Sequence, residues 1–550
     1  MATNCGVLNI AKTDEEQSRP KNGTSVLPFS GNCTLKLESK NVEQLHKIVF
    51  NAESLDNIKT LILTKTDLNK LPNSFTHNLG NLIHLNLEEN KFTHLPPNMR
   101  NLNKLQHFNI SNNCLKSLPE DIGMLNKLCD LRLENNSLTE LPNSLCDLKS
   151  LVHLNVADNN LKTLPNDIGN LQNLEKLDIS GNILEELPES VGCLSNLYYF
   201  SAASNKLTCL PEGFTHFNKL TILNLSHNSL YDVPYCLFTG LPNISTLDLS
   251  HNYVDDFSKA PTCISKLRVL NASHNTLFCM PRWIFQDSCR QMLELNLSHN
   301  RYMNGVGNDI FITESSLKIV DISDCNLTTT SVSFLNGLHN LESLNIGNKV
   351  DPNSKLSSDY GNVFWDLPIK EMRNTVKIHE LIMCGVGLAG LQEDIVKLSA
   401  IQYIDLRSNE LNWLPEAFCE LVNLRTCLLS NNGLALLPFQ IGKLTSLKEF
   451  SLDGNKLHTL PETMADLGQL EYFDLYDNNF EEVPMVIKSM KNLKGLDLEY
   501  NCFDTSQSLE FMDTYSQMKC SIRKRLSRNS QFRKDSIKKS LDYETLYSSL

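Results

Sequence analysis

LVHLNVADNNLKTLPNDIGNLQ, residues 151–172, has near copies on both sides, and this repetition decides the fold. Residues 154–156 alternate apolar, polar and apolar side chains, which is the period of a strand with one buried face. At Asn159 the chain must turn, and a buried side-chain amide can pair with backbone groups that have lost their strand partners. Pro165 cannot donate a backbone hydrogen bond, so the return path is predicted to be extended or loosely coiled. One unit cannot bury its own leucines, and the copies must therefore stack.

The position of Asn159, termed here the ladder position, recurs at steps of 23 to 25 residues in the first run of units. It holds asparagine in 15 units: Asn90, Asn113, Asn136, Asn159, Asn182, Asn205, Asn228, Asn252, Asn275, Asn300, Asn409, Asn432, Asn455, Asn478 and Asn501. The same position holds Lys40 and Thr66 near the start of the chain, and Cys325, Lys349 and Val386 in the middle, where the step from Lys349 to Val386 is 37 residues. The sequence therefore predicts 20 stacked units joined by an asparagine ladder.

These repeated residues resemble the leucine-rich-repeat family, and the LPxxIGxL return path is similar to its 23-residue intracellular class. The resemblance implies an α/β solenoid, a leucine-rich-repeat horseshoe with a parallel sheet on the concave face and about 20 repeats. We expect a flexible N-terminal segment at 1–34, a solenoid at 35–504 and a capping helix with a basic tail at 505–550. The solenoid is expected to be degenerate, with an insertion, at about 301–377, and the protein to be a monomer.

The formal net charge of −13 is unevenly distributed along the chain. Residues 519–540 contain nine Lys or Arg and one Asp, a net charge of +8, and since −13 less +8 is −21, the remainder is strongly acidic. A nucleic-acid binder needs a basic face on its folded part to neutralise phosphates. The charge distribution therefore favours protein partners and no nucleic acid.

The 17 cysteines are scattered, without the paired clusters that usually cap extracellular relatives. The first 16 residues, MATNCGVLNIAKTDEE, lack a basic segment followed by an apolar core, and no apolar run approaches membrane-spanning length. We therefore expect a cytoplasmic protein with reduced thiols and no transmembrane segment. No CxxC pair, Gly-rich phosphate loop or nucleophile elbow is present, so we predict no enzyme activity, no cofactor and no metal.

The sequence KIVF at residues 47–50 fits the short docking motif recognised by the catalytic subunit of protein phosphatase one. In that motif a basic residue, Val or Ile, any residue and Phe follow one another, which makes Lys47, Ile48 and Phe50 the candidate docking residues. The alternative is that these apolar side chains pack beneath the first unit as its hydrophobic cap.

Near the C-terminus, apolar residues recur at spacings of three and four, as in an amphipathic helix that closes the end of the array. They are Leu509, Met512, Tyr515, Met518, Ile522 and Leu526. Beyond them, Ser527 and Ser536 each follow basic residues two and three positions earlier, a pattern that basophilic kinases favour; the alternative is a solvated basic tail. The ending with Ser548 and Leu550 fits a PDZ ligand, whose leucine enters an apolar pocket.

Tyrosine and acidic residues concentrate at the variable strand positions of the final units, and this surface is the predicted partner-binding patch. Its residues are Tyr403, Arg407, Tyr472, Asp474, Tyr476, Asp477, Asp497, Glu499 and Tyr500, with Glu449 and Asp453 nearby. The alternative is an ordinary solvated face.

Two further groups leave a functional and a structural interpretation open. The residues just before four successive ladder asparagines are His227, His251, His274 and His299. They could bind a metal or sense pH, or simply favour the turn. The insertion contains Tyr360, Phe364 and Trp365, which could contact a partner or cover a weak point of the stack.

The absence of catalytic motifs indicates a binding scaffold. The uninterrupted LP-type repeats and the docking motif resemble the Ras-group leucine-rich-repeat scaffolds, which bring a Ras-type GTPase and a phosphatase catalytic subunit together. The resemblance implies a non-catalytic protein-protein interaction scaffold in intracellular signalling. The alternatives are a substrate adaptor of a multi-subunit ligase, or a cortical or junctional adaptor that uses its PDZ-type C-terminus.

Overall fold

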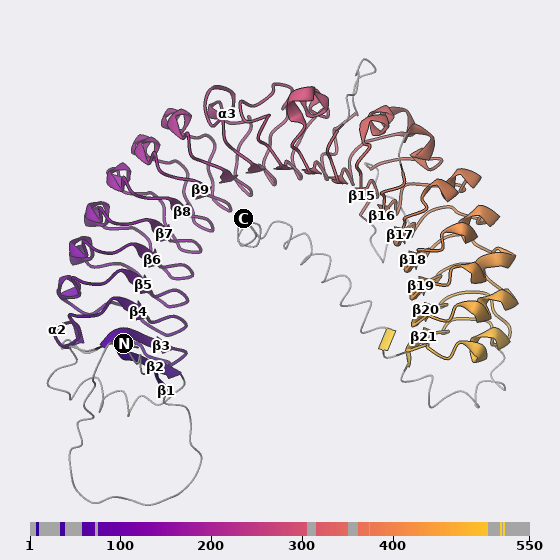
Figure 1. Cartoon of the computed structure of the whole chain (residues 1–550), viewed down its shortest axis with the longest axis horizontal. Helices are drawn as coiled ribbons and strands as arrows, with labels where there is room; N and C mark the ends of the chain where they lie inside the picture. Colours follow the sequence, from indigo (N-terminus) through magenta and orange to yellow (C-terminus); the bar gives the residue numbers. More distant parts are fainter. Residues whose placement is uncertain are drawn as a thin grey trace, which may run out of the picture. The chain divides into compact units, whose positions relative to one another are not determined.

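The chain forms two compact units, residues 1–275 and 276–550, which are described separately. The structure is a computed structural model and describes residues 7–9, 33–38, 58–71, 75–304, 315–349, 361–372, 375–503, 518–519 and 521–522. Each unit stacks parallel strands along one side and short helical turns along the other (Figure 1). Among the described residues, no helix has the length and apolar character needed to cross a membrane.

Nearly all the strands are three residues long, and each pairs in parallel with its neighbours within a unit. The strands of unit 1 are β1 (Val7–Asn9), β2 (Cys33–Glu38), β3 (Ile58–Thr64), β4 (His84–Asn86), β5 (His107–Asn109), β6 (Asp130–Arg132), β7 (His153–Asn155), β8 (Lys176–Asp178), β9 (Tyr199–Ser201), β10 (Ile222–Asn224), β11 (Thr246–Asp248) and β12 (Val269–Asn271). Those of unit 2 are β13 (Glu294–Asn296), β14 (Ile319–Asp321), β15 (Ser343–Asn345), β16 (Glu380–Ile382), β17 (Tyr403–Asp405), β18 (Thr426–Leu428), β19 (Glu449–Ser451), β20 (Tyr472–Asp474) and β21 (Gly495–Asp497).

Among the described residues, the return paths carry single helical turns, two of them α-helical and the others 3-10. In unit 1 they are α2 (Phe75–Asn78), η1 (Met99–Asn101), η2 (Glu120–Met124), η3 (Asn143–Asp147), η4 (Ile168–Asn170), η5 (Glu189–Cys193), η6 (Glu212–His216) and α3 (Cys236–Thr239). In unit 2 they are η7 (Arg282–Phe285), η8 (Asp287–Cys289), η9 (Thr329–Ser331), η10 (Ser333–Gly337), η11 (Pro368–Glu371), η12 (Glu393–Lys397), η13 (Glu416–Glu420), η14 (Phe439–Lys443), η15 (Glu462–Asp466) and η16 (Met485–Ser489). The predicted α/β solenoid is confirmed, because β2 to β21 supply one strand for each predicted unit.

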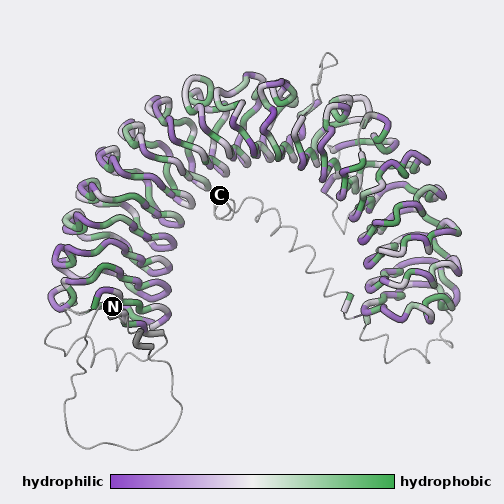
Figure 2. The backbone as a smooth tube through the Cα atoms, in the orientation of Figure 1, coloured by the Kyte–Doolittle hydropathy of each residue, from purple (hydrophilic) through white to green (hydrophobic). Residues whose placement is uncertain are grey.

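The core runs lengthwise between the strands and the helical turns of each unit. The middle residue of each strand points into it, as Leu154 of β7 does, and it stacks in register on Leu177 of β8. Figure 2 shows hydrophobic residues recurring in repeat after repeat along both units. The first and third strand residues point the other way, and the surface that they form is called the strand face below.

The ladder asparagines satisfy the turn that follows each strand. Asn159 Nδ2 donates to the carbonyl oxygen of Leu133, in the preceding repeat, at 3.0 Å and to that of Val156, in its own repeat, at 3.1 Å. Its Oδ1 accepts the backbone N–H of Leu138 at 2.9 Å. Because each side-chain amide bonds to two successive repeats, the ladder couples neighbouring repeats as well as closing the turns.

The residue before the ladder position adopts a left-handed conformation in unit after unit. Asp158, for example, has φ 52°, and Gly181 occupies the same place in the next unit with φ 62°. Asn, Asp, His and Gly tolerate this conformation best among the amino acids. Backbone geometry therefore favours these residue types at the turn.

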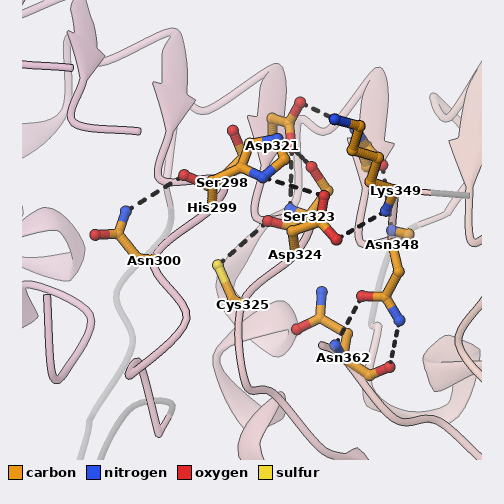
Figure 3. Close-up of polar contacts among 12 residues, drawn as sticks. Ser298, His299, Asn300, Asp321, Ser323, Asp324, Cys325, Asn348, Lys349 and Asn362 are labelled. Atoms are coloured by element: carbon orange, nitrogen blue, oxygen red, sulfur yellow. Dashed lines mark hydrogen bonds and ion pairs between the residues drawn. The ribbon is translucent and has the colours of Figure 1, made fainter. Parts of the chain in front are cut away.

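The prediction that Lys349 occupies the ladder position is wrong, because Asn362 makes the ladder bonds instead. Figure 3 shows where both residues lie. Asn362 Nδ2 donates to the carbonyl oxygens of Ile322 at 2.8 Å and Ile346 at 3.0 Å, and its Oδ1 accepts the N–H of Leu327 at 3.0 Å. These are the bonds of a regular ladder asparagine. The insertion therefore precedes the ladder residue of its unit, and Lys349 is exposed.

Cys325 does occupy the ladder position, as predicted. Its thiol donates to the carbonyl oxygen of Leu297 at 3.3 Å. It also donates to the carbonyl oxygen of Ser323 at 3.5 Å, a bond shown in Figure 3. Burial raises the pKa of this thiol far above its usual value, so it remains protonated and can act as a donor.

At the start of the chain, β1 pairs in parallel with β2, with Leu8 opposite Leu35. The strand lies within the segment 1–34, for which the sequence predicts no regular structure. Three residues are too few for a periodic signal, and the pairing partner supplies the order.

Candidate functional site

The last five strands of unit 2, β17 to β21, bring most of the predicted partner-binding residues onto one face. In-register pairing aligns their side chains in columns. The first strand positions hold Tyr403, Thr426, Glu449, Tyr472 and Gly495, and the third hold Asp405, Leu428, Ser451, Asp474 and Asp497. Two residues beyond the strands lie Arg407, Ser430, Asp453, Tyr476 and Glu499. These three columns are called the C-terminal strand face.

The aspartates of this face have a structural role in addition to their charge. Asp474 and Asp497 each accept, through Oδ1, the backbone N–H two residues later at 3.1 Å. Asn155 does the same in unit 1 at 3.0 Å. One carboxylate oxygen therefore holds the end of the strand, and the charge remains on the strand face.

The tyrosines contribute aromatic surface to the patch. Tyr403 and Tyr472 are half-buried on the strands, and the rings of Tyr476 and Tyr500 lie 4.9 Å apart at 52°. Tyr500 and Asp477 occupy the left-handed turn position, with φ 58° and 53°, and are exposed. Those two residues thus lie on the turns bordering the strand face.

Arg407 is held by an acidic neighbour within the face. Its Nε donates to Asp405 Oδ1 at 2.9 Å and its guanidinium to Oδ2 at 2.8 Å, and Asp405 is fully buried. Burial lowers the pKa of Arg407, but the hydrogen bonds and charge of Asp405 outweigh this effect and raise the pKa above its usual value. Arg407 therefore neutralises the negative charge of Asp405 within this face.

Asp453 is a partly buried carboxylate of this face. Burial raises its pKa, and Asp497 raises it further, whereas the hydrogen bond from Ser430 and the charge of Arg407 lower it. The net direction is upward, so keeping this carboxylate ionised is costly. A cation placed on this surface would reduce that cost.

Part of the predicted C-terminal helix lies against the same face. Residues 518–519 and 521–522 are helical, and Lys519 forms an ion pair with Glu499. Ile522 is buried beside Gly495 of β21. The described part of this helix therefore contacts the strand face, in addition to any role in closing the end of the array.

The other short motifs lie outside the described residues. These are the phosphatase-docking candidates Lys47, Ile48 and Phe50, the phosphorylation candidates Ser527 and Ser536, and the PDZ-ligand candidates Ser548 and Leu550. Tyr360 of the insertion also lies outside.

The histidine column of unit 1 is a stack of rings. His251 lies 3.8 Å from His227 and 3.9 Å from His274, ring centre to ring centre, with the planes within 13°. All three have φ between 53° and 54°, the left-handed conformation that histidine tolerates. Within the described ranges, no group of three or more His, Cys, Asp or Glu residues could hold a metal ion. The left-handed conformation gives the turn interpretation of these residues a geometric basis.

The aromatic residues of the insertion divide between the two alternatives. Phe364 is fully buried and covers the stack, whereas Trp365 is 72% exposed. Trp365 and Trp413, which is also exposed, border a shallow hollow that the sequence analysis did not identify. Its other lining residues are Asp366, Lys370, Gly390, Leu391, Gln392, Glu393 and Asp394. Two of the three tryptophans of the chain lie here, and this was the available sequence signal.

Comparisons with known proteins support the repeat assignment. Two family models, both described as leucine rich repeat, match the chain, one at residues 172–230 and 218–277 and the other at 104–125 and 150–171. No curated protein matches the sequence.

Solved structures share the fold at low sequence identity. A leucine-rich-repeat protein of Leptospira interrogans is 24% identical with a TM-score of 0.53, over 88% of this chain and 99% of that one. The Arabidopsis receptor kinase HAESA, in complex with the peptide hormone IDA and the co-receptor SERK1, is 22% identical with a TM-score of 0.54, over 86% and 82%. The plant peptide hormone receptor RGFR1, in complex with RGF2, is 23% identical with a TM-score of 0.55, over 82% and 79%. These likenesses show the fold alone.

Proposed function

We propose, from the premise that the chain is a leucine-rich-repeat protein, that it is a non-catalytic scaffold that binds a protein partner on the C-terminal strand face. The observation that carries this proposal is the gathering of tyrosines and carboxylates on β17 to β21. Tyrosine combines a large contact area with a polar tip and is enriched in interface hot spots. The surrounding carboxylates would steer a basic partner toward the surface.

The partner pair that we propose is a Ras-type GTPase and a protein phosphatase catalytic subunit, held together in the cytoplasm. Support comes from the KIVF motif at residues 47–50 and from the resemblance of the LP-type repeats to scaffolds of that group.

Affinity purification of the full chain from its native cells tests both levels of the proposal. The double variant Tyr472→Ala with Tyr476→Ala should recover at least 10-fold less of the specific partners, since hot-spot residues each contribute about 2 kcal/mol or more. Tyr199→Ala is the matched control, because Tyr199 holds the first strand position of β9 in unit 1. Equal recovery of every protein by the wild type and the double variant would mean that this patch does not bind the partner.

The identity of the recovered proteins decides the finer proposal. A Ras-type GTPase together with a phosphatase catalytic subunit supports it, and Phe50→Ala should then remove the phosphatase alone. Ubiquitin-ligase subunits would instead favour a substrate adaptor. Loss of a cell-border location after removal of Leu550 would favour a junctional adaptor.

A further inference from the structure

The strand face has a gap at the first position of β21. In β17 to β20 this position carries the side chains of tyrosine, threonine or glutamate, whereas in β21 it is Gly495. Ile522 of the C-terminal helical segment lies directly over this glycine and is only 3% exposed. An apolar side chain of the chain's own C-terminal region thus occupies the place where a strand side chain is missing.

The fit between Gly495 and Ile522 is close. A Cβ atom on Gly495 would lie 3.1 Å from the Cβ of Ile522 and 2.7 Å from Cδ1 of Tyr472. The first distance is already tighter than ordinary contact, and the second would force Tyr472 to shift. The absence of a side chain at this position therefore allows the helical segment to approach the sheet.

A charged contact accompanies the apolar one. Lys519 precedes Ile522 by three residues, so both lie on the same side of the helical segment. Its ammonium group pairs with Glu499, two residues beyond the end of β21, and both side chains are partly buried. Two anchors of different chemistry thus hold the segment on the strand face.

The charges of the two sides are complementary over a wider area. The C-terminal strand face carries six carboxylates and one guanidinium, and the latter is already paired with Asp405. Four of the other carboxylates lie on β19 to β21 or on the turn after β19: Glu449, Asp453, Asp474 and Asp497. The segment that begins at Lys519 carries a net charge of +8 by residue 540.

We propose that the strand face of β19 to β21 is a docking site for a basic helical segment, and that its resident occupant is residues 518–540 of the same chain. This inference rests on the proposed function in one respect: the external partner binds the same face and must displace the tail. Phosphorylation of Ser527 and Ser536 releases the tail, because each phosphate removes about 1.5 to 2 charges from a segment of net charge +8.

A labelled synthetic peptide of residues 518–540 tests the docking site on the full chain. In the wild type the resident tail competes with this probe. In the variant Lys519→Glu with Ile522→Glu the resident tail is released, and the probe should bind at least 10-fold more tightly, as measured by fluorescence anisotropy. A peptide that carries the same two substitutions is the matched control and should bind at least 10-fold more weakly to the released chain.

Two variants of the face then locate the probe. Gly495→Leu, made in the released chain, should abolish binding by filling the position over which Ile522 lies. Asp474→Asn with Asp497→Asn keeps the turn bonds, since Asn155 makes the same bond in unit 1, and should weaken binding at least 10-fold. A probe phosphorylated at both serines should likewise lose at least 10-fold.

Three results would overturn the proposal. One is equal affinity of the probe for the wild type and the released chain, and another is affinity that is unaffected by either face variant. The third is a wild type that sediments as a dimer and a released chain that sediments as a monomer, because the occupant would then be the tail of a second copy. Partner recovery separates the two proposals. If the tail docks but the tyrosine variant loses no partner, only the proposed function is contradicted. If the tyrosine variant loses its partner but the probe does not bind, only the docking of the tail is contradicted.

Discussion

The ladder of unit 1 and the interrupted stretch of unit 2 around β14 to β16 solve the same problem with different residues. In unit 1, Asn159 and its equivalents close each turn with a side-chain amide. In unit 2, successive ladder positions hold the thiol of Cys325, the amide of Asn362 and the apolar side chain of Val386. The fold therefore requires that the turn carbonyls and amides be satisfied, and does not require one residue at one spacing.

The backbone itself compensates at Val386, which has no side-chain acceptor. In unit 1, the N–H two residues after a ladder asparagine donates to the next asparagine, as Leu161 does to Asn182 Oδ1 at 2.9 Å. Phe364 holds the corresponding place after Asn362, and its N–H donates to the carbonyl oxygen of Val386 at 2.9 Å. A small adjustment of the main chain thus replaces the missing amide.

The largest effect should come from Phe364, which takes the core place that Leu161 has in unit 1. Phe364→Ala removes a fully buried ring and should cost about 3 to 5 kcal/mol of local unfolding free energy. Trp365→Ala, next to it, should change stability by no more than about 0.5 kcal/mol, because this side chain is exposed. Hydrogen exchange of the β15 and β16 amides measures both, and equal effects would mean that the ring is not a core residue.

The next effect distinguishes Asn362 from Lys349. Asn362→Leu leaves the carbonyls of Ile322 and Ile346 without their side-chain donor and should cost about 1 to 3 kcal/mol, comparable to Asn159→Leu in unit 1. Lys349→Leu should cost less than about 0.5 kcal/mol, since this side chain is exposed. Local hydrogen exchange is again the measurement. A larger loss for Lys349→Leu than for Asn362→Leu would restore the original assignment.

The regular units could be predicted because each depends only on spacing within about two dozen residues. Asn362 could also have been found, since NVFWDLP at residues 362–368 repeats the arrangement of NNLKTLP at 159–165. Extending the repeat spacing by a fixed step did not find Asn362, because the insertion displaces the ladder residue by 13 positions, from 349 to 362.

The partner-binding patch was predictable to the extent that strand register places residues in columns. The hydrogen bond between Arg407 and Asp405 depends on the conformations of both side chains, and these could not be predicted from the sequence. The contact of Ile522 with Gly495 joins a strand to a segment beyond the last repeat, where the periodicity no longer applies. Contacts that lie outside the repeat are thus the ones that only the structure supplies.

A smaller effect should follow from converting the interrupted ladder back to the regular one. Cys325→Asn would supply a stronger donor to Leu297 and an amide acceptor that the thiol lacks, and should stabilise unit 2 by about 0.5 to 1.5 kcal/mol. Thermal unfolding followed by circular dichroism measures the gain. Cys325→Ser is the control for size and polarity. Equal stability of the asparagine and serine variants would mean that the side-chain oxygen of the introduced asparagine accepts no hydrogen bond.

The smallest effect concerns pH and contrasts His299 of unit 2 with the stacked histidines of unit 1. His299 Nδ1 lies 3.1 Å from Asp324 Oδ2. Burial lowers the pKa of His299, whereas Asp324 and Asp321 raise it and Arg301 and Lys349 lower it, and the net direction is downward.

Because the folded state binds this proton less readily than the unfolded state, the contribution of His299 to stability is lost as the pH falls below the usual histidine value of about 6.5. His299→Gln should therefore reduce the loss of stability between pH 7.5 and pH 5.5 by less than about 1 kcal/mol. Asp324→Asn keeps the acceptor for the Lys349 N–H but removes the charge that raises the pKa of His299, so it should enlarge the loss. Urea unfolding at the two pH values measures both variants, and a change of the same sign in each would mean that the ion pair does not control this titration.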